Sequence, residues 1–158
     1  MRIIQHDEPV WRDRANFIHR LEFSYGGEEI GEQIWTRTLG DGWYELCCIT
    51  FYAYGLALGD HLQFREDLAF TGSIRPQGRQ TVRLFQPACD RKNAEALHRL
   101  FDELGVLVES QSAALHAIDF PSSSALDSAL PRLIEFTSSS ASEFEHSNAE
   151  GLSFGVDE

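Results

Sequence analysis

The sequence is short of three things that would narrow its function quickly: lysine, cysteine and long apolar runs. Its 158 residues include a single lysine, Lys92. The three cysteines are odd in number and two of them are adjacent, which does not suggest a disulfide framework and favours a reducing cytoplasm. No stretch reaches the roughly 20 apolar residues that cross a bilayer. Charged residues interrupt the first 17 positions, unlike a signal peptide.

Catalytic motifs are also missing. The sequence has no GxSxG, no glycine-rich phosphate loop, no HExxH and no CxxC, and its six histidines are scattered singly. A zinc site from Asp60, His61 and a distant cysteine lacks the ligand-pair spacing that zinc sites show. Asp60 and Glu32 would form a carboxylate pair only if the fold brought them together. We therefore predict no enzyme, no metal and no cofactor.

The charge balance is strongly acidic, with 25 acidic and 13 basic residues and a net charge of −12. Residues 1–87 carry 12 acids and 9 bases, whereas residues 88–158 carry 13 acids and 4 bases. Nucleic acids and anionic membranes need a basic surface, so neither is an expected partner. A basic protein partner would suit this charge, since complementary charge speeds association. The alternative is that the acidic surface serves solubility alone.

The first half is predicted to be a β-rich subdomain over residues 15–78, after a polar lead-in at residues 1–14. Turns are indicated by Gly26-Gly27 and by Asp41-Gly42, because glycine and aspartate tolerate positive φ. Strands are predicted at residues 15–24, 30–37, 43–49, 61–64 and 68–75. These short strands favour a small curled sheet or a partial barrel.

The second half is predicted to be a ferredoxin-like subdomain over residues 79–148, followed by an acidic tail at residues 149–158. Asp90 is placed to cap a helix from Arg91 to Leu104, and Gly105 to end it. Ser124 is placed to cap a second helix that runs to about Ser138. Pro131 would kink this helix or delay its start. Its predicted apolar face consists of Leu126, Leu130, Leu133, Ile134 and Thr137. With strands around 80–87, 106–110, 114–120 and 142–148, the order is βαββαβ. The fold class is therefore α+β.

One stretch resists assignment: ITFYAYGLALGD, residues 49–60. It follows neither the two-residue period of a strand nor the 3.6-residue period of a helix. We expect Phe51, and Tyr52 or Tyr54, to pack over the seam between the two halves, because aromatic side chains supply large buried areas. Gly59-Asp60 is expected to form the turn into the next strand.

This stretch belongs to a set of motifs, here Glu32 with Trp35, Gly40 to Gly42, Phe51 to Asp60, and Thr81 with Arg83. In these motifs, over about residues 30–119, the chain resembles a bacterial family known as domain-of-unknown-function family 4265. It departs from the family at Cys48-Ile49-Thr50, where members commonly have Asn-Ile-Pro. The family carries no assigned reaction. Some small acidic bacterial proteins of this kind resemble immunity partners of secreted toxins.

Together these features favour a cytoplasmic immunity protein (antitoxin) that occludes the active site of a cognate secreted toxin. Toxins that act on nucleic acids or nucleotides tend to have basic clefts, which an acidic surface can fill. The candidate contacts are the acidic residues of the predicted first helix and of the C-terminal region: Glu95, Asp102, Glu103, Glu143, Glu145 and Glu150.

The alternative is a small-molecule-binding or regulatory module with a pocket between the two halves. Its candidate lining residues are Trp35, Tyr52, Tyr54 and Arg83. A ferredoxin-like half often serves in sensing, but the fold alone does not establish that function.

Overall fold

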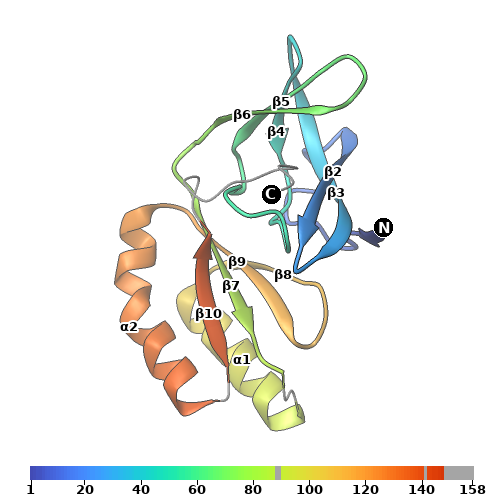
Figure 1. Cartoon of the computed structure of the whole chain (residues 1–158). Coiled ribbons are helices and arrows are strands. Elements are labelled where there is room, and N and C mark those ends of the chain that lie inside the picture. The colour runs from blue at the N-terminus through green and yellow to red at the C-terminus, as the bar shows by residue number, and fades with distance from the viewer. Residues whose placement is uncertain (88–89, 141, 148–158) are drawn as a thin grey trace.

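The computed structural model describes residues 1–87, 90–140 and 142–147. It contains a six-stranded sheet, a four-stranded sheet and two helices that cover one face of the four-stranded sheet (Figure 1). The predicted α+β class, a curled sheet followed by a ferredoxin-like half, is confirmed. The expected acidic tail, with Glu150, lies outside the described residues.

The first sheet curls without closing into a barrel. Its strands are β1 (Arg2–Ile4), β2 (Phe17–Tyr25), β3 (Glu28–Gly40), β4 (Trp43–Leu46), β5 (His61–Phe64) and β6 (Phe70–Arg75). They lie in the order β1-β3-β4-β5-β6, and β2 pairs with β3. All neighbours are antiparallel except β1, which runs parallel to β3.

The turns of this sheet form where the sequence predicts them. Gly26 and Gly27, with φ of 58° and 77°, join β2 to β3, and Asp41 and Gly42, with φ of 54° and 79°, join β3 to β4. A Cβ added to Gly42 would lie 2.9 Å from the carbonyl oxygen of Phe64, so glycine is required there by both conformation and space.

Two parts of the first half differ from expectation. The strand predicted at residues 43–49 ends at Leu46, because the chain leaves the sheet there and residues 47–60 form no regular secondary structure. Residues 1–14 are more than a polar lead-in, since they supply β1 and bury Ile4 and His6.

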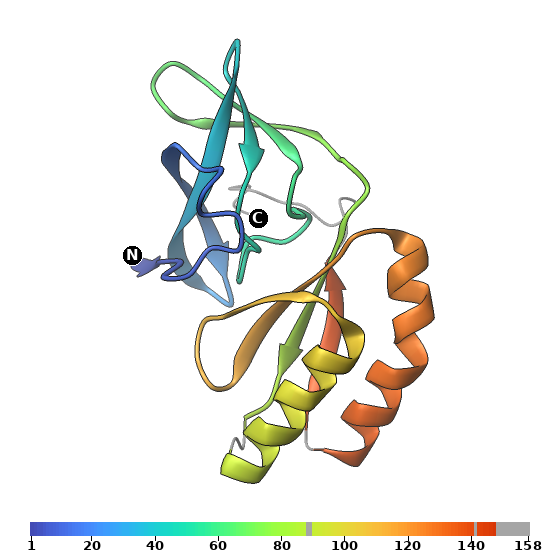
Figure 2. The same cartoon turned by 180° about the vertical axis from the view of Figure 1, so that it is seen from behind.

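The second sheet has the order β10-β7-β9-β8 with antiparallel neighbours, which is the ferredoxin-like arrangement (Figure 2). Its elements are β7 (Gln80–Phe85), α1 (Arg91–Leu104), β8 (Leu107–Ser110), β9 (Leu115–Phe120), α2 (Ser123–Ser139) and β10 (Glu143–Ser147). Neither described helix is long and apolar enough to cross a membrane.

Helix α1 has the predicted bounds and caps. The Asp90 carboxylate accepts a hydrogen bond from the amide of Asn93 at 2.8 Å, and Gly105 takes the left-handed conformation at the C-terminal end. Leu97 and Leu100 are buried against the sheet.

Helix α2 is shifted from its prediction. Ser122 caps it instead of Ser124, and the helix continues through the exposed Pro131. The predicted apolar face is wrong at Ile134, which is 53% exposed. The buried face runs instead through Leu126, Ala129, Leu133 and Phe136, at helical spacing.

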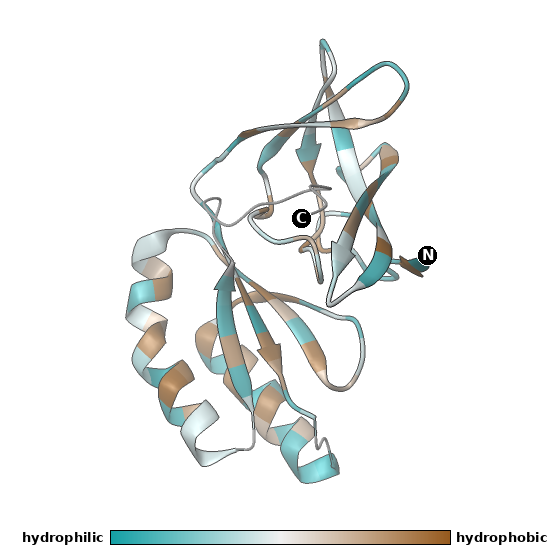
Figure 3. Ribbon diagram, in the orientation of Figure 1, coloured by the Kyte–Doolittle hydropathy of each residue, from teal (hydrophilic) through white to brown (hydrophobic). Residues whose placement is uncertain are grey.

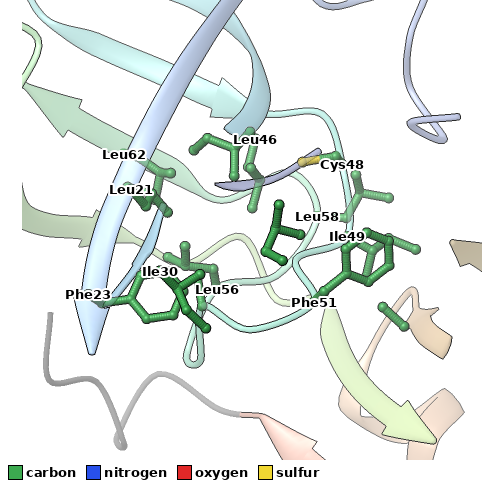
Figure 4. Packing of buried hydrophobic residues seen from close by; sticks show 14 of the residues in the cluster. Leu21, Phe23, Ile30, Leu46, Cys48, Ile49, Phe51, Leu56, Leu58 and Leu62 are labelled. Atoms are coloured by element: carbon green, nitrogen blue, oxygen red, sulfur yellow. The ribbon is translucent and has the colours of Figure 1, made fainter. Parts of the chain in front are cut away.

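Each half has an apolar core of its own. Hydrophobic residues occur along both helices and on the strands beneath them, where Val82, Leu84 and Ile118 are fully buried (Figure 3). The first core draws side chains from the sheet and from residues 47–60, which point into one interior (Figure 4). Residues 47–60, although they form no helix or strand, are therefore part of the core.

Candidate functional site

The segment of residues 47–60, here called the seam loop, lies between the two halves. Most of its residues are buried, although they belong to no helix or strand. Buried backbone amides and carbonyls need hydrogen-bond partners, which regular secondary structure normally supplies. In the seam loop charged side chains from three other segments provide many of these partners.

Glu32, on β3, binds the amides of the seam loop. Its side chain is fully buried. One carboxylate oxygen accepts from the amide of Phe51 at 2.6 Å, and the other accepts from Tyr52 at 3.0 Å and Ala53 at 2.8 Å. Burial opposes ionisation, but the hydrogen bonds from His6 and from the amides of Phe51 and Ala53 lower the pKa of Glu32. A single carboxylate thus accepts hydrogen bonds from the amides of three successive residues.

Arg83, on β7, binds the carbonyls of the same residues. Its Nε donates to the carbonyl of Phe51 at 2.7 Å, and its Nη2 donates to the carbonyl of Ala53 at 2.8 Å. Nη2 also donates to the Thr50 hydroxyl at 3.1 Å, while the guanidinium lies 4.5 Å from the ring centre of Tyr54. Glu32 therefore binds the amides, and Arg83 the carbonyls, of one short segment of the seam loop.

His6 links Glu32 to Glu109 and so joins the chain's beginning to both halves. Its Nε2 lies 2.9 Å from Glu32, its Nδ1 lies 2.7 Å from Glu109, and its ring stacks on Phe51 at 4.4 Å. Burial alone would lower the pKa of His6, but the hydrogen bonds to the two carboxylates raise it to about 9. At neutral pH the ring is an imidazolium that donates at both nitrogens. Glu109 also accepts from the amide of Ile49 at 2.5 Å.

The far end of the loop is held by Asp60 and Thr81. Asp60 accepts from the amides of Ala57 at 2.9 Å and Gln77 at 3.0 Å, and burial raises its pKa to about 6. Thr81 donates to the carbonyl of Leu56 at 3.1 Å. The predicted turn into β5 is confirmed, since Gly59 has a φ of 85°.

These contacts limit the chemistry of the seam. Glu32 and Asp60 bind different parts of the loop and do not form a carboxylate pair. Burial raises the pKa of Cys47 to about 11 and raises that of Cys48 well above its usual range, so both thiols are protonated and poor nucleophiles. Within the described ranges, no three histidine, cysteine or acidic side chains gather as metal ligands. The buried charged residues therefore hold the seam loop in one conformation.

The part of the seam loop that is accessible to solvent is aromatic. Phe51 is buried as predicted, but Tyr52 and Tyr54 are only half-buried. The ring of Tyr25, which is 39% exposed, lies 5.3 Å from that of Tyr52 and 5.9 Å from that of Tyr54. The Tyr54 hydroxyl donates to Glu145, on β10.

The adjoining part of this surface is acidic. Glu143 pairs with Phe85 across β10 and β7, and Glu145 pairs with Arg83, so all four side chains lie on the face of the sheet away from the helices. Phe85 is 46% exposed, and both glutamates are exposed. We call the whole patch the seam surface; its members are Tyr25, Tyr52, Tyr54, Phe85, Glu143 and Glu145.

The residues proposed for a pocket are only partly brought together. The Arg83 guanidinium contacts the ring of Tyr54. The ring of Tyr25 packs against the rings of both Tyr52 and Tyr54, so Tyr52 lies close to this pair. Trp35 lies on the opposite face of β3 from Glu32, with the Arg12 guanidinium 5.5 Å from its ring centre. A hollow of about 340 Å³ does occur beside the seam loop, but its lining residues are Asp7, Glu8, Phe51, Val108, Glu109 and Ser110.

The two predicted acidic groups lie on different elements. Glu95 pairs with Arg91 at 3.3 Å, and Glu103 pairs with Arg132 at 2.9 Å. Asp102 lines a cavity beside α1. The three acids of α1 are matched by its three bases, so the helix carries no net charge. Glu143 and Glu145 lie instead beside the tyrosines.

Sequence reasoning missed His6, Glu109 and Tyr25 as members of this region. His6 and Glu109 are 103 positions apart and belong to no shared motif. Glu32, Asp60, Thr81 and Arg83 were found through the family motifs, and each of them holds the seam loop.

Comparison with solved structures finds a hypothetical protein from Neisseria gonorrhoeae. It matches with a TM-score of 0.62 and 18% sequence identity, over 87% of this chain and 99% of that chain. This likeness concerns the fold alone. No curated protein matches the chain. The family model of the domain of unknown function DUF4265 matches residues 32–139, which begin at the buried Glu32 and end with α2. The chain therefore belongs to the DUF4265 family.

Proposed function

We propose that this chain is a cytoplasmic immunity protein that binds a cognate secreted bacterial toxin and occludes its active site through the seam surface. One observation carries the proposal: two half-exposed tyrosines sit on a loop held by buried charges, next to two exposed glutamates. Occlusion requires a complementary surface and no chemistry of its own.

The tyrosines suit such a surface. Tyrosine offers a large contact area for few rotatable bonds, and it is enriched where protein interfaces are strongest. Tyr52 and Tyr54 belong to a backbone fixed by Glu32 and Arg83, so little conformational entropy is lost when a partner binds. A preformed aromatic patch is an efficient anchor.

The glutamates favour a basic partner. Glu143 and Glu145 are exposed on the edge strand of a protein with a net charge of −12. A toxin with a basic cleft would be attracted to this face, and the association rate would fall as salt rises, because charges are screened over about 10 Å at 0.1 M salt.

The test is protection of cells that express a toxin from a neighbouring gene. Glu143→Lys with Glu145→Lys should slow association and weaken protection without unfolding the protein, because both side chains are exposed. The matched control reverses Glu95, Asp102 and Glu103 on the charge-balanced helix α1 and should protect nearly as well as the parent.

A reversed ranking would move the interface to α1. If both variants protect cells as well as the parent does, these acidic residues are not the contacts. If no toxin binds the chain in pull-down or neighbouring-gene tests, the immunity function is wrong.

A further inference from the structure

A serine and a histidine face each other across the hairpin of β8 and β9. Ser110, the last residue of β8, is in register with His116 on β9. The Ser110 Oγ lies 2.6 Å from the Nδ1 of His116, and the Nε2 of His116 lies 3.1 Å from the carbonyl oxygen of Ala113. Three groups are thus aligned as hydroxyl, imidazole and carbonyl.

The carbonyl decides where the proton of the imidazole resides. A carbonyl oxygen only accepts hydrogen bonds, so the Nε2 of His116 must carry a hydrogen. His116 is 6% exposed, and burial lowers its pKa, so the ring is neutral at pH 7. Its Nδ1 then holds a lone pair that accepts the hydroxyl proton of Ser110. A hydroxyl paired with an oriented base is the arrangement of an activated nucleophile.

A cavity of about 590 Å³ lies beside this pair, between α1 and the hairpin. Its walls include Leu97, Phe101, Val106 and Val108, and Ser110 and His116 line it as well. This volume is within the range of small-molecule sites, and the apolar walls suit a short hydrocarbon group. Ser110 is exposed, so a ligand in the cavity can reach its hydroxyl.

We propose that Ser110 is an acyl-accepting nucleophile, with His116 as its general base, for esters that carry a short apolar acyl group. The Ser110 Oγ attacks the ester carbonyl carbon, and its proton moves to the Nδ1 of His116. The bond from that carbon to the alcohol oxygen breaks, and the alcohol leaves with the proton. Water, deprotonated by His116, then releases the carboxylic acid and restores the serine. This activity is independent of toxin binding.

The same hairpin offers a second serine for comparison. Ser112 lines the same cavity, but its hydroxyl accepts hydrogen bonds from the amides of Ala114 and Leu115 at 3.1 and 3.2 Å. It has a similar environment without the base. Its reactivity should be that of an ordinary serine.

The experiment treats the full chain with a fluorophosphonate probe, which forms a bond from phosphorus to serine oxygen and releases fluoride. Mass spectrometry should find one probe per chain, on Ser110. Ser110→Ala should abolish labelling, and His116→Gln should slow it by about 10²-fold, as expected when a general base is lost. The control Ser128→Ala, at an exposed serine of α2 outside the cavity, should leave the labelling rate unchanged. Labelling should also slow in acid as His116 becomes protonated. A burst of p-nitrophenol from p-nitrophenyl butyrate should follow the same ranking.

Thermal melting of each variant shows whether it is folded. If His116→Gln does not fold, Val106→Phe, which fills the cavity and leaves the serine–histidine hydrogen bond in place, should slow labelling at Ser110. Absence of labelling in the parent, labelling that persists in Ser110→Ala, or equal rates for the parent, the folded His116→Gln and Val106→Phe would overturn the proposal.

Discussion

The two halves of the molecule supply hydrogen-bond partners to their buried backbone amides and carbonyls in different ways. In the second half, α1, α2 and four strands pair their own amides and carbonyls, and Leu84, Leu100 and Leu133 fill the space between them. In the first half, the seam loop enters the core without regular structure and relies on Glu32, Arg83 and Glu109. The difference means that ionisation should affect the two halves unequally.

The contrast also explains why the halves are not independent units. Arg83 and Glu109 belong to the second sheet, yet their partners are in the seam loop of the first half. Removing a buried partner leaves an uncompensated charge, which costs more than the pair itself contributes. The following predictions test this contrast, from the largest expected effect to the smallest.

Glu32→Ala should lower the free energy of unfolding by about 3–5 kcal/mol, the usual cost of breaking a buried ion pair. The substitution leaves three amides without their acceptor and His6 without one of its two carboxylates. Urea denaturation measures the change. Glu28→Ala, on the exposed end of the same strand, is the control and should change stability by less than about 1 kcal/mol.

Phe51→Ala should cost about 3–5 kcal/mol, because the side chain is 3% exposed and stacks on His6. Leu100→Ala in the other half is the matched substitution and should cost about 2–5 kcal/mol. Both are read from denaturant midpoints. A loss below roughly 1 kcal/mol for Phe51→Ala would place this residue outside the core.

Raising the pH should destabilise the protein through His6. Its pKa is about 9 in the folded protein and about 6.5 when unfolded, so its contribution is fully present below pH 6.5 and is lost as pH rises through 9. The loss amounts to about 3 kcal/mol. The pH dependence of unfolding should show this slope in the parent, and His6→Gln should lack it. Parallel curves would show that His6 is not charged in the fold.

Glu145→Gln should have the smallest effect, at most about 1 kcal/mol, because its contact with Tyr54 is exposed to solvent. Calorimetric melting at low and high salt would detect it. A loss comparable to that of Glu32→Ala would mean that the seam surface belongs to the structural network as well.

Local signals in the sequence were sufficient for much of the fold. Gly26-Gly27 and the caps of α1 depend on neighbouring residues, and both were predicted correctly. The exposed Ile134 was missed because the face of α2 depends on how the helix is set against the sheet. His6 and Glu109 were missed for a related reason: a lone buried charge is recognised only when its partner, 103 positions away, is known.

The bridge of His6 to Glu32 and Glu109 has a consequence for synthesis on the ribosome. The seam loop cannot acquire all its partners until β8 has emerged, so Ile49, Leu56 and Leu58 stay accessible while some fifty further residues are translated. Contacts that span so much sequence are slow to form, and nascent apolar segments attract chaperones or aggregate. A nascent chain arrested before Glu109 should therefore remain protease-sensitive within the seam loop, whereas one arrested well beyond β10 should resist cleavage there.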